Sequence, residues 1–357
     1  MGQVRRSWEY FRRERFLTGG SAVVAAASQA GGVYTPQPPS RFAYFGTYTV
    51  PGKVVKIRLS DFTKVGALTL GSGDNYLVSA VIDTLNGFVY FGTNTSPGKV
   101  VKIRLSDFTK IGTLTLDTGE NNLRTAVIDA LNGFAYFGTD TSPGRIVKIR
   151  LSDFTKVGAI TLDTDENYLW SAVIDTFNGF AYFGSYTSIG KVVKIRLSDF
   201  TKVGTITLDF GEGHLQSAVI DTLYGFAYFG TASSPGKIIK IRLSDFTKVG
   251  TLTLDTGENY LYSAVIDTLN GFAYFGTDTS PGRIVKIRLS DFTKVGILTL
   301  DSGENYLRSS VIDVAQDFAY FGTNTAPGKI IKIRLSDFTK VETLTIAENY
   351  LHSAVID

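Results

Sequence analysis

The chain contains no cysteine and few of the other residues that carry metal or redox chemistry, with two histidines and one methionine among 357 residues. The absence of cysteine excludes disulfides, thiolate metal sites and cysteine nucleophiles. The two histidines, His214 and His352, show no spacing typical of metal ligands. No serine stands in a nucleophile elbow, and no glycine-rich loop precedes a helix. We therefore find no motif that names a reaction, expect no cofactor, and do not expect an enzyme.

A charge excess is also missing from most of the chain. The net charge is +3, and residues 1–40 hold five arginines and two glutamates, so the remaining residues are neutral overall. A nucleic-acid-binding protein of this size usually carries an excess of lysine and arginine over its footprint. We therefore expect no nucleic-acid partner.

Long hydrophobic runs are absent as well, and we expect no transmembrane span. The weakly apolar run from Phe16 to Ala30 is too short to cross a bilayer as a helix. It follows an arginine-rich start and ends in small residues, which is the layout of a secretory signal. Residues 12–17 resemble a twin-arginine export signal with one extra residue. We expect residues 1–40 to be a leader with a proline-rich linker, and the protein to be periplasmic, extracellular or on the cell surface. The alternative is a basic N-terminal extension without a targeting signal.

The chain does contain a strict repeat. The nonapeptide Lys-Ile-Arg-Leu-Ser-Asp-Phe-Thr-Lys occurs seven times without a change, at a period of 46 residues. Its copies begin at Lys56, Lys102, Lys148, Lys194, Lys240, Lys286 and Lys332. A period of this length indicates a repeat architecture, in which each unit is one supersecondary element and stacking builds the core. We therefore expect residues 41–357 to form one array.

Each unit reads as four short strands. In residues 255–300 we expect strands at 260–266, 272–276, 283–289 and 294–300, separated by turns that include Asn270-Gly271, a strong hairpin signal. Connections this short indicate an antiparallel meander, because parallel strands need long crossovers. Stacked units of this kind are β-propeller blades. A β-helix is the main alternative, but its parallel strands would not need the Asn-Gly hairpin.

The two ends of the array predict a closed ring. The array begins with the second strand type at Phe42 and ends with the first strand type at residues 350–357. Both strand types occur seven times, so the last strand can fill the innermost place of the first blade. The prediction is an all-β, seven-bladed propeller with four antiparallel strands per blade, closed by the C-terminal strand. We also expect Asp83 and its equivalents to form structural ion pairs with Arg58 and its equivalents.

The repeat resembles the YVTN family of β-propellers. Residues 270–277, 284–289 and 295–300 take the places of that family's turn and strands. The Thr-Asn of the family name is replaced by Gly-Thr, and the resemblance covers residues 41–357. It implies an exported or cell-surface protein of varied role, and it carries no catalytic residue across.

Two positions of the repeat differ strongly between units. The first lies at the start of the first strand, and its residues are Val78, Arg124, Trp170, Gln216, Tyr262, Arg308 and His352. The second follows the second strand, and its residues are Tyr48, Asn94, Asp140, Tyr186, Ala232, Asp278 and Asn324. In a propeller both positions fall on one face, and the first should surround the mouth of the central channel. Tryptophan, tyrosine and arginine are enriched at binding hot spots.

These two variable positions suggest a binding surface on a constant scaffold, recognising a protein or a glycan. Neutral drift at exposed loops in a structural, surface-layer or filament module is one alternative. A propeller enzyme of lactonase or lyase type, with its site in the channel mouth, is the other. We expect a monomeric propeller and leave assembly into larger structures open.

Acidic residues on the same face give a weaker indication. Each unit places one acid before its first strand, and these are Asp74, Glu120, Glu166, Glu212, Glu258, Glu304 and Glu348. They could hold a cation such as calcium. No unit has a full calcium-loop pattern, so we interpret them as solvated turn residues.

Overall fold

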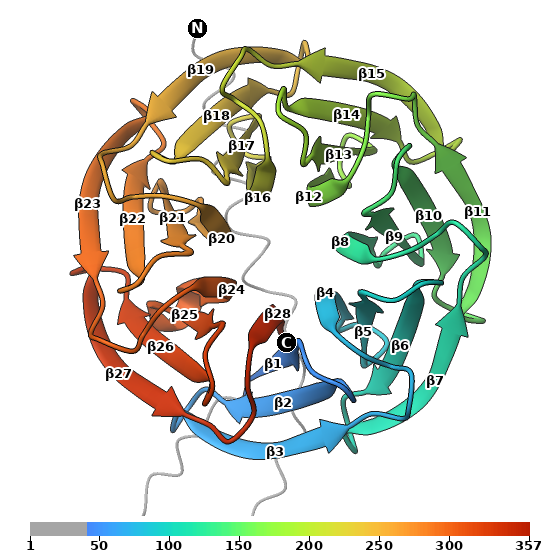
Figure 1. Ribbon diagram of the computed structural model, residues 1–357, viewed down its shortest axis with the longest axis horizontal. Helices are drawn as coiled ribbons and strands as arrows, with labels where there is room; N and C mark the ends of the chain where they lie inside the picture. The colour runs from blue at the N-terminus through green and yellow to red at the C-terminus, as the bar shows by residue number, and fades with distance from the viewer. Residues whose placement is uncertain (1–40) are drawn as a thin grey trace, which may run out of the picture. The chain divides into compact units, whose positions relative to one another are not determined.

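The computed structural model describes residues 41–357, and these form seven four-stranded antiparallel sheets in a ring (Figure 1). The predicted all-β, seven-bladed propeller is confirmed. The one helical element in this range is the short 3₁₀ helix η1 (Val314–Gln316). No helix of residues 41–357 is long and apolar enough to cross a membrane. The leader and linker expected in residues 1–40 lie outside the described residues.

Each blade runs from an inner strand beside the channel to an outer strand at the rim. Blades 1 to 3 consist of β28 (Leu351–Ile356), β1 (Phe42–Thr47), β2 (Lys53–Arg58) and β3 (Thr63–Thr69); β4 (Leu77–Asp83), β5 (Phe88–Thr93), β6 (Lys99–Arg104) and β7 (Thr109–Thr115); and β8 (Leu123–Asp129), β9 (Phe134–Thr139), β10 (Arg145–Arg150) and β11 (Thr155–Thr161). Blades 4 and 5 consist of β12 (Leu169–Asp175), β13 (Phe180–Ser185), β14 (Lys191–Arg196) and β15 (Thr201–Thr207); and β16 (Leu215–Asp221), β17 (Phe226–Thr231), β18 (Lys237–Arg242) and β19 (Thr247–Thr253). Blades 6 and 7 consist of β20 (Leu261–Asp267), β21 (Phe272–Thr277), β22 (Arg283–Arg288) and β23 (Thr293–Thr299); and β24 (Leu307–Asp313), β25 (Phe318–Thr323), β26 (Lys329–Arg334) and β27 (Thr339–Thr345).

The C-terminal strand closes the ring as predicted. Strand β28 pairs antiparallel with β1, from Ala43 opposite Ile356 to Thr47 opposite Leu351. The backbone N–H of Phe42 donates to Asp357 Oδ1 at 2.6 Å, and Arg41 Nε donates to the Asp357 carbonyl at 2.9 Å. Closure therefore pairs the edge of β1 that faces the channel with β28 and completes the four strands of blade 1.

The core lies between the blades, because the second strand of each blade is buried on both faces. In β9 five of the six residues are buried, among them Tyr136 and Phe137. These side chains belong to clusters that join residues of two adjacent blades. An aromatic, β-prone strand without a polar face is what this double coverage requires.

A glycine in that strand lets the next blade approach closely. A Cβ built on Gly138 would lie 2.7 Å from Thr125 Cγ2 and 3.0 Å from Leu169 Cβ, and Leu169 belongs to the neighbouring blade. No larger residue fits there without displacing one of them. The glycine of the Gly-Thr pair is therefore a packing requirement between blades.

The invariant nonapeptide is part of the same blade-to-blade packing. The ammonium group of Lys148 lies 4.1 Å from the ring centroid of Phe134 and 5.4 Å from that of Phe200 in the next blade. It also donates to the Leu197 carbonyl of that blade at 3.5 Å. Burial lowers the pKa of Lys148. The first lysine and the phenylalanine of the motif thus join neighbouring blades, which explains why both are the same in all seven copies.

The prediction of ion pairs between Asp83 and its equivalents and Arg58 and its equivalents is wrong. Arg150, at the second of these positions, instead forms a salt bridge at 2.6 Å with Asp153, three residues further on. Asp175, at the first, accepts hydrogen bonds from the backbone and side chain of Asn178 within its own turn. Both groups find partners locally, because a turn of four residues brings those partners within reach before a neighbouring strand can.

Candidate functional site at the channel mouth

The first variable position lies in a β-bulge of each inner strand. In β12 the pairing with β13 jumps from Leu169 to Ser171, so Trp170 is the extra residue without a partner. A bulge redirects the side chain of its extra residue. The same shift occurs at Leu77/Ser79, Leu123/Thr125, Leu215/Ser217, Leu261/Ser263 and Leu307/Ser309, and β28 places its shift at Thr47 opposite Leu351. The repeat therefore presents seven variable side chains from one irregular backbone position.

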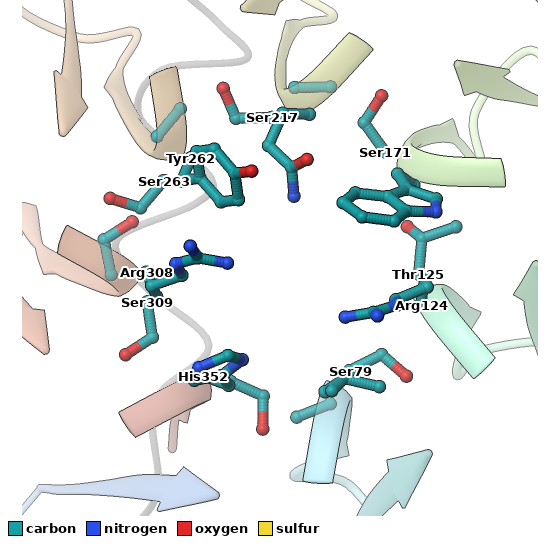
Figure 2. Close-up of a pocket in the computed structure, with 18 of the residues that line it drawn as sticks. Ser79, Arg124, Thr125, Ser171, Ser217, Tyr262, Ser263, Arg308, Ser309 and His352 are labelled. Carbon is teal, nitrogen blue, oxygen red and sulfur yellow. The ribbon is translucent and has the colours of Figure 1, made fainter. Parts of the chain in front are cut away.

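These seven side chains surround an opening at the inner ends of the blades. The opening has a volume of about 180 Å³ and is lined by three successive rings of residues, of which the variable ring is the first. The second ring is Ser79, Thr125, Ser171, Ser217, Ser263, Ser309 and Ser353, and the third is alanine except for Ser310. Figure 2 shows Arg124 and Arg308 pointing into this opening from opposite sides. We refer to it as the channel mouth.

The hydroxyl ring was missed in the sequence because its members hardly vary. Ser171 Oγ donates to the Leu215 carbonyl of the next blade at 2.9 Å, and Ser79 Oγ donates to the Leu123 carbonyl at 2.7 Å. Ser217, Ser263, Ser309 and Ser353 also donate to a leucine carbonyl of the following blade, so six of the seven inner-strand junctions are made in this way. These hydroxyls hold the inner strands together directly beneath the variable ring. Their position next to the variable residue in every repeat was the available signal.

The two variable positions contact each other across blade junctions. Trp170 Nε1 donates to Asp140 Oδ1 at 2.7 Å, although the two residues belong to different blades. Arg308 donates to Asp278 in the same way, through Nε at 3.0 Å and a terminal nitrogen at 2.7 Å. The second variable residue of one blade thus contacts the first variable residue of the next blade. The sequence placed both positions on one face, but it did not indicate this pairing.

His352 and Asn324 form a third pair of this kind. The ring Nε2–H of His352 donates to Asn324 Oδ1 at 2.9 Å, and the His352 ring stacks on Tyr48 with centroids 4.5 Å apart. Burial, together with the charges of Arg308 and Arg124, lowers the pKa of His352 to about 3. The imidazole is therefore neutral at physiological pH.

Aromatic rings support the two arginines. The guanidinium carbon of Arg124 lies 4.5 Å from the Trp170 ring centroid, and Trp170 stacks on Tyr186 at 3.9 Å. On the other side of the mouth, Arg308 lies 4.0 Å from the ring centroid of Tyr262. Cation–π contacts of this kind contribute about 0.5–2 kcal/mol each, depending on exposure. Both guanidinium groups are thus held in place by contacts with neighbouring blades.

Tyr262 keeps its hydroxyl proton over the physiological range. Burial is the main cause that raises its pKa, to about 12, and Tyr186 and Asp278 act in the same direction, whereas Arg308 opposes them. The Tyr262 hydroxyl therefore keeps its proton and can donate a hydrogen bond at neutral pH, and Tyr186 is a hydrogen-bond partner within its reach.

The remaining variable residues have simpler surroundings. Asn94 Nδ2 donates to the Tyr48 hydroxyl at 3.0 Å. Gln216 lines the mouth with its Oε1 atom buried and unpaired among the described residues. Val78 contributes an apolar group to the lining. Ala232 has a methyl side chain, so the second variable position offers no side-chain hydrogen-bond partner at that junction.

The acidic residues before the inner strands are not solvated, which corrects the interpretation of the sequence. Glu166 is 2% exposed and accepts hydrogen bonds from Lys202 at 2.6 Å and from Thr205 at 2.5 Å. Glu212 is bonded in the same way to Lys248 and Thr251. Lysines of the outer strands thus already neutralise these carboxylates. No group of three or more potential metal ligands occurs in residues 41–357.

The two histidines lie apart, in agreement with their different contacts. His214 packs edge-on against Tyr186 at 4.6 Å, whereas His352 contacts Tyr48 and Asn324. They therefore form no shared metal site within the described part of the chain.

Comparison with known proteins identifies the fold alone. No protein-family model matches the chain, and no curated protein matches its sequence. A candidate 6-phosphogluconolactonase from Bacteroides fragilis superimposes with a TM-score of 0.71 at 12% identity, covering 90% of this chain and 100% of its own. A protein from Lactobacillus plantarum gives a TM-score of 0.68 at 13% identity, over 89% and 99% of the two chains. The U3-55K protein gives 0.64 at 9% identity, over 78% and 84%. Chains this distant in sequence share the propeller architecture with residues 41–357 and carry no function across.

Proposed function

We propose that this propeller is a binding protein without catalytic activity, which recognises a protein or a glycan through the channel mouth and the loops around it. The observation that carries the proposal is the convergence of variation. Positions that differ between otherwise near-identical repeats meet in space and contact each other across blade junctions, as Asp140 and Trp170 do. Drift at unrelated exposed loops would not require such contacts.

The composition of the mouth supports recognition. Trp170, Tyr262, Arg124 and Arg308 are of the types that dominate binding energy at interfaces. They stand on a rigid scaffold and are held by each other, so little conformational freedom is lost when a partner binds.

A lactonase-type enzyme is the second candidate, and the Bacteroides fragilis structure is the observation that favours it. The mouth provides little for such chemistry. His352, the one imidazole that lines it, is a weak base because its pKa is about 3 and its Nε2–H is bound to Asn324. These facts support placing recognition ahead of turnover.

Partner capture with matched variants tests the proposal. The protein is immobilised and probed with cell extracts and a glycan array, alongside a variant in which Arg124, Trp170, Tyr262 and Arg308 are replaced by alanine. A control variant carries alanine at four residues at the opposite ends of the strands: Phe177 and Leu269 in turns, and Arg150 and Arg242 at the last positions of β10 and β18. We expect specific partners to be lost with the first variant and kept with the second. Partners that survive the first variant undiminished would refute the proposal.

We also propose that the protein acts outside the cytoplasm, on the basis of the N-terminal layout. Fractionation of producing cells, followed by N-terminal sequencing of the mature chain, would test this. Retention of an intact N-terminus in the cytoplasm would contradict it.

A further inference from the structure

The charge that lines the channel mouth is of one sign. Arg124 and Arg308 belong to the lining, whereas no aspartate or glutamate does. Their acidic partners, Asp140 and Asp278, lie in the loops that follow β9 and β21 and are not part of the lining. Each arginine has one aspartate partner, but only the arginines line the opening. The opening therefore presents positive charge to a ligand. Figure 2 shows both guanidinium groups directed into the open space.

The arginines keep donors free for a ligand. Arg124 makes one side-chain hydrogen bond within residues 41–357, from Nε to Asp140 at 3.4 Å, and Arg308 uses Nε and one terminal nitrogen on Asp278. A guanidinium group has five N–H donors in a planar fork that matches the two oxygens of a carboxylate. The side chains are 20% and 23% exposed, so the remaining donors are accessible from the mouth.

The size of the opening limits what can enter. The opening has a volume of about 180 Å³. Pockets for whole drug-sized ligands measure about 300–1,000 Å³. The mouth therefore accepts one side chain or one end of a larger ligand.

The aromatic rings at the mouth favour a peptide over a carbohydrate. A sugar ring is usually held against an open aromatic face, but Trp170 carries Arg124 on its ring and Tyr186 stacked on it. The ring of Tyr262 is covered by Arg308. The Trp170 ring is therefore already engaged by Arg124 and Tyr186 and one face of Tyr262 by Arg308, whereas the arginines keep unused donors.

We propose that the channel mouth binds the carboxylate side chain of an acidic segment in a partner protein, through the guanidinium groups of Arg124 and Arg308. This inference rests on the binding function proposed above and specifies the chemistry of its central contact. The ring of Tyr262 lies beside Arg308 and supports its guanidinium group on this side of the mouth. The pKa of His352 provides an internal reporter, because a bound carboxylate would offset the arginine charges that help to lower it.

Titration of the full chain with two short end-blocked peptides and one acidic oligosaccharide tests the inference. The probes are tetraglutamate, tetraglutamine and tetragalacturonate, and binding is followed by calorimetry and by the ring-proton NMR signal of His352. We expect tetraglutamate to bind with a salt-dependent affinity, to raise the apparent pKa of His352, and to bind at least tenfold more tightly than either other probe. Equal or tighter binding of tetraglutamine or tetragalacturonate would overturn the inference.

Matched variants locate the contact. Arg124→Gln together with Arg308→Gln should weaken tetraglutamate binding at least tenfold, and the lysine versions should restore part of it, because lysine keeps the charge without the fork. Arg150→Gln with Arg242→Gln makes the same change of charge on the opposite face and should leave the affinity within twofold. Circular dichroism confirms that each variant is folded, and unchanged affinity in a folded Arg124→Gln/Arg308→Gln protein would overturn the inference.

The two proposals fail in distinguishable ways. If captured partners depend on the mouth residues but tetraglutamate does not bind, the carboxylate inference is wrong and the binding function stands. If partner capture is indifferent to the mouth residues, the binding function itself is wrong.

Discussion

Acidification should lower the free energy of unfolding of this propeller through one side chain, His352. The imidazole is buried at the channel mouth, where Tyr48 stacks on it, Asn324 accepts its Nε2–H, and Arg308 and Arg124 contribute positive charge. Its pKa is about 3 in the folded protein, against 6.5 as the ordinary value. Between these two values the unfolded chain binds a proton that the folded chain does not.

The sign and size of the effect follow from that difference. Stability from this group is fully present above pH 6.5 and is lost as the pH falls toward 3, because the unfolded state gains the proton first. Proton linkage with these two pKa values gives a loss of about 2 kcal/mol between pH 7 and pH 5. For a chain of this size, the melting temperature should fall by roughly 3 °C.

Two measurements check this prediction. Thermal unfolding at pH 7 and pH 5 is compared between the original protein and His352→Gln, which cannot titrate, and the variant should lack about 2 kcal/mol of the pH-dependent loss. NMR titration of the histidine ring protons gives the pKa directly, and His214→Gln assigns the two signals. A His352 midpoint near 6.5, or equal pH dependence of both proteins, would show that the mouth does not exclude the charged imidazole.

Two further substitutions test the packing between blades. Gly138→Ala should lower the free energy of unfolding by about 1–3 kcal/mol, because its Cβ would lie 2.7 Å from Thr125 and 3.0 Å from Leu169. The control Gly158→Ala, whose Cβ would have its nearest neighbour at 4.0 Å, should change it by less than about 0.5 kcal/mol in urea unfolding. Equal effects of the two substitutions would contradict the close approach of the blades at Gly138. Glu166→Gln should lower the free energy of unfolding by about 1.5–3 kcal/mol, because the buried carboxylate that Lys202 and Thr205 contact loses its charge. The control Asp153→Asn removes an exposed charge and should shift the melting temperature far less. An unchanged melting temperature of Glu166→Gln would show that the buried pair adds no stability.

The sequence predicts the propeller well because its decisive features are local. A period of 46 residues, four short strands and turns such as Asn270-Gly271 determine a blade, and the strand types at Phe42 and residues 350–357 predict the closure by β28. None of these inferences needs a contact between distant side chains.

The details of the channel mouth could not be predicted in the same way. The contact between Asp140 and Trp170 depends on the rotation between adjacent blades and on the bulge at Trp170. Neither feature can be predicted from a pattern of residue types. Glu166 looked like a solvated turn residue because its partner Lys202 comes 36 residues later, on the outer strand of the next blade. Interactions that cross blades are set by stacking geometry, which a repeat pattern alone leaves open.

The pairing of the two variable positions has a consequence for how such an array can change. Asp140 and Trp170 belong to different blades, but they are 30 residues apart in the chain, and so are Asp278 and Arg308. A 46-residue segment that starts at a second strand and ends with the following inner strand therefore carries both members of a contacting pair. Duplication or exchange of such segments between near-identical repeats would transfer matched pairs intact, so the mouth could gain new combinations without breaking the contacts that order it.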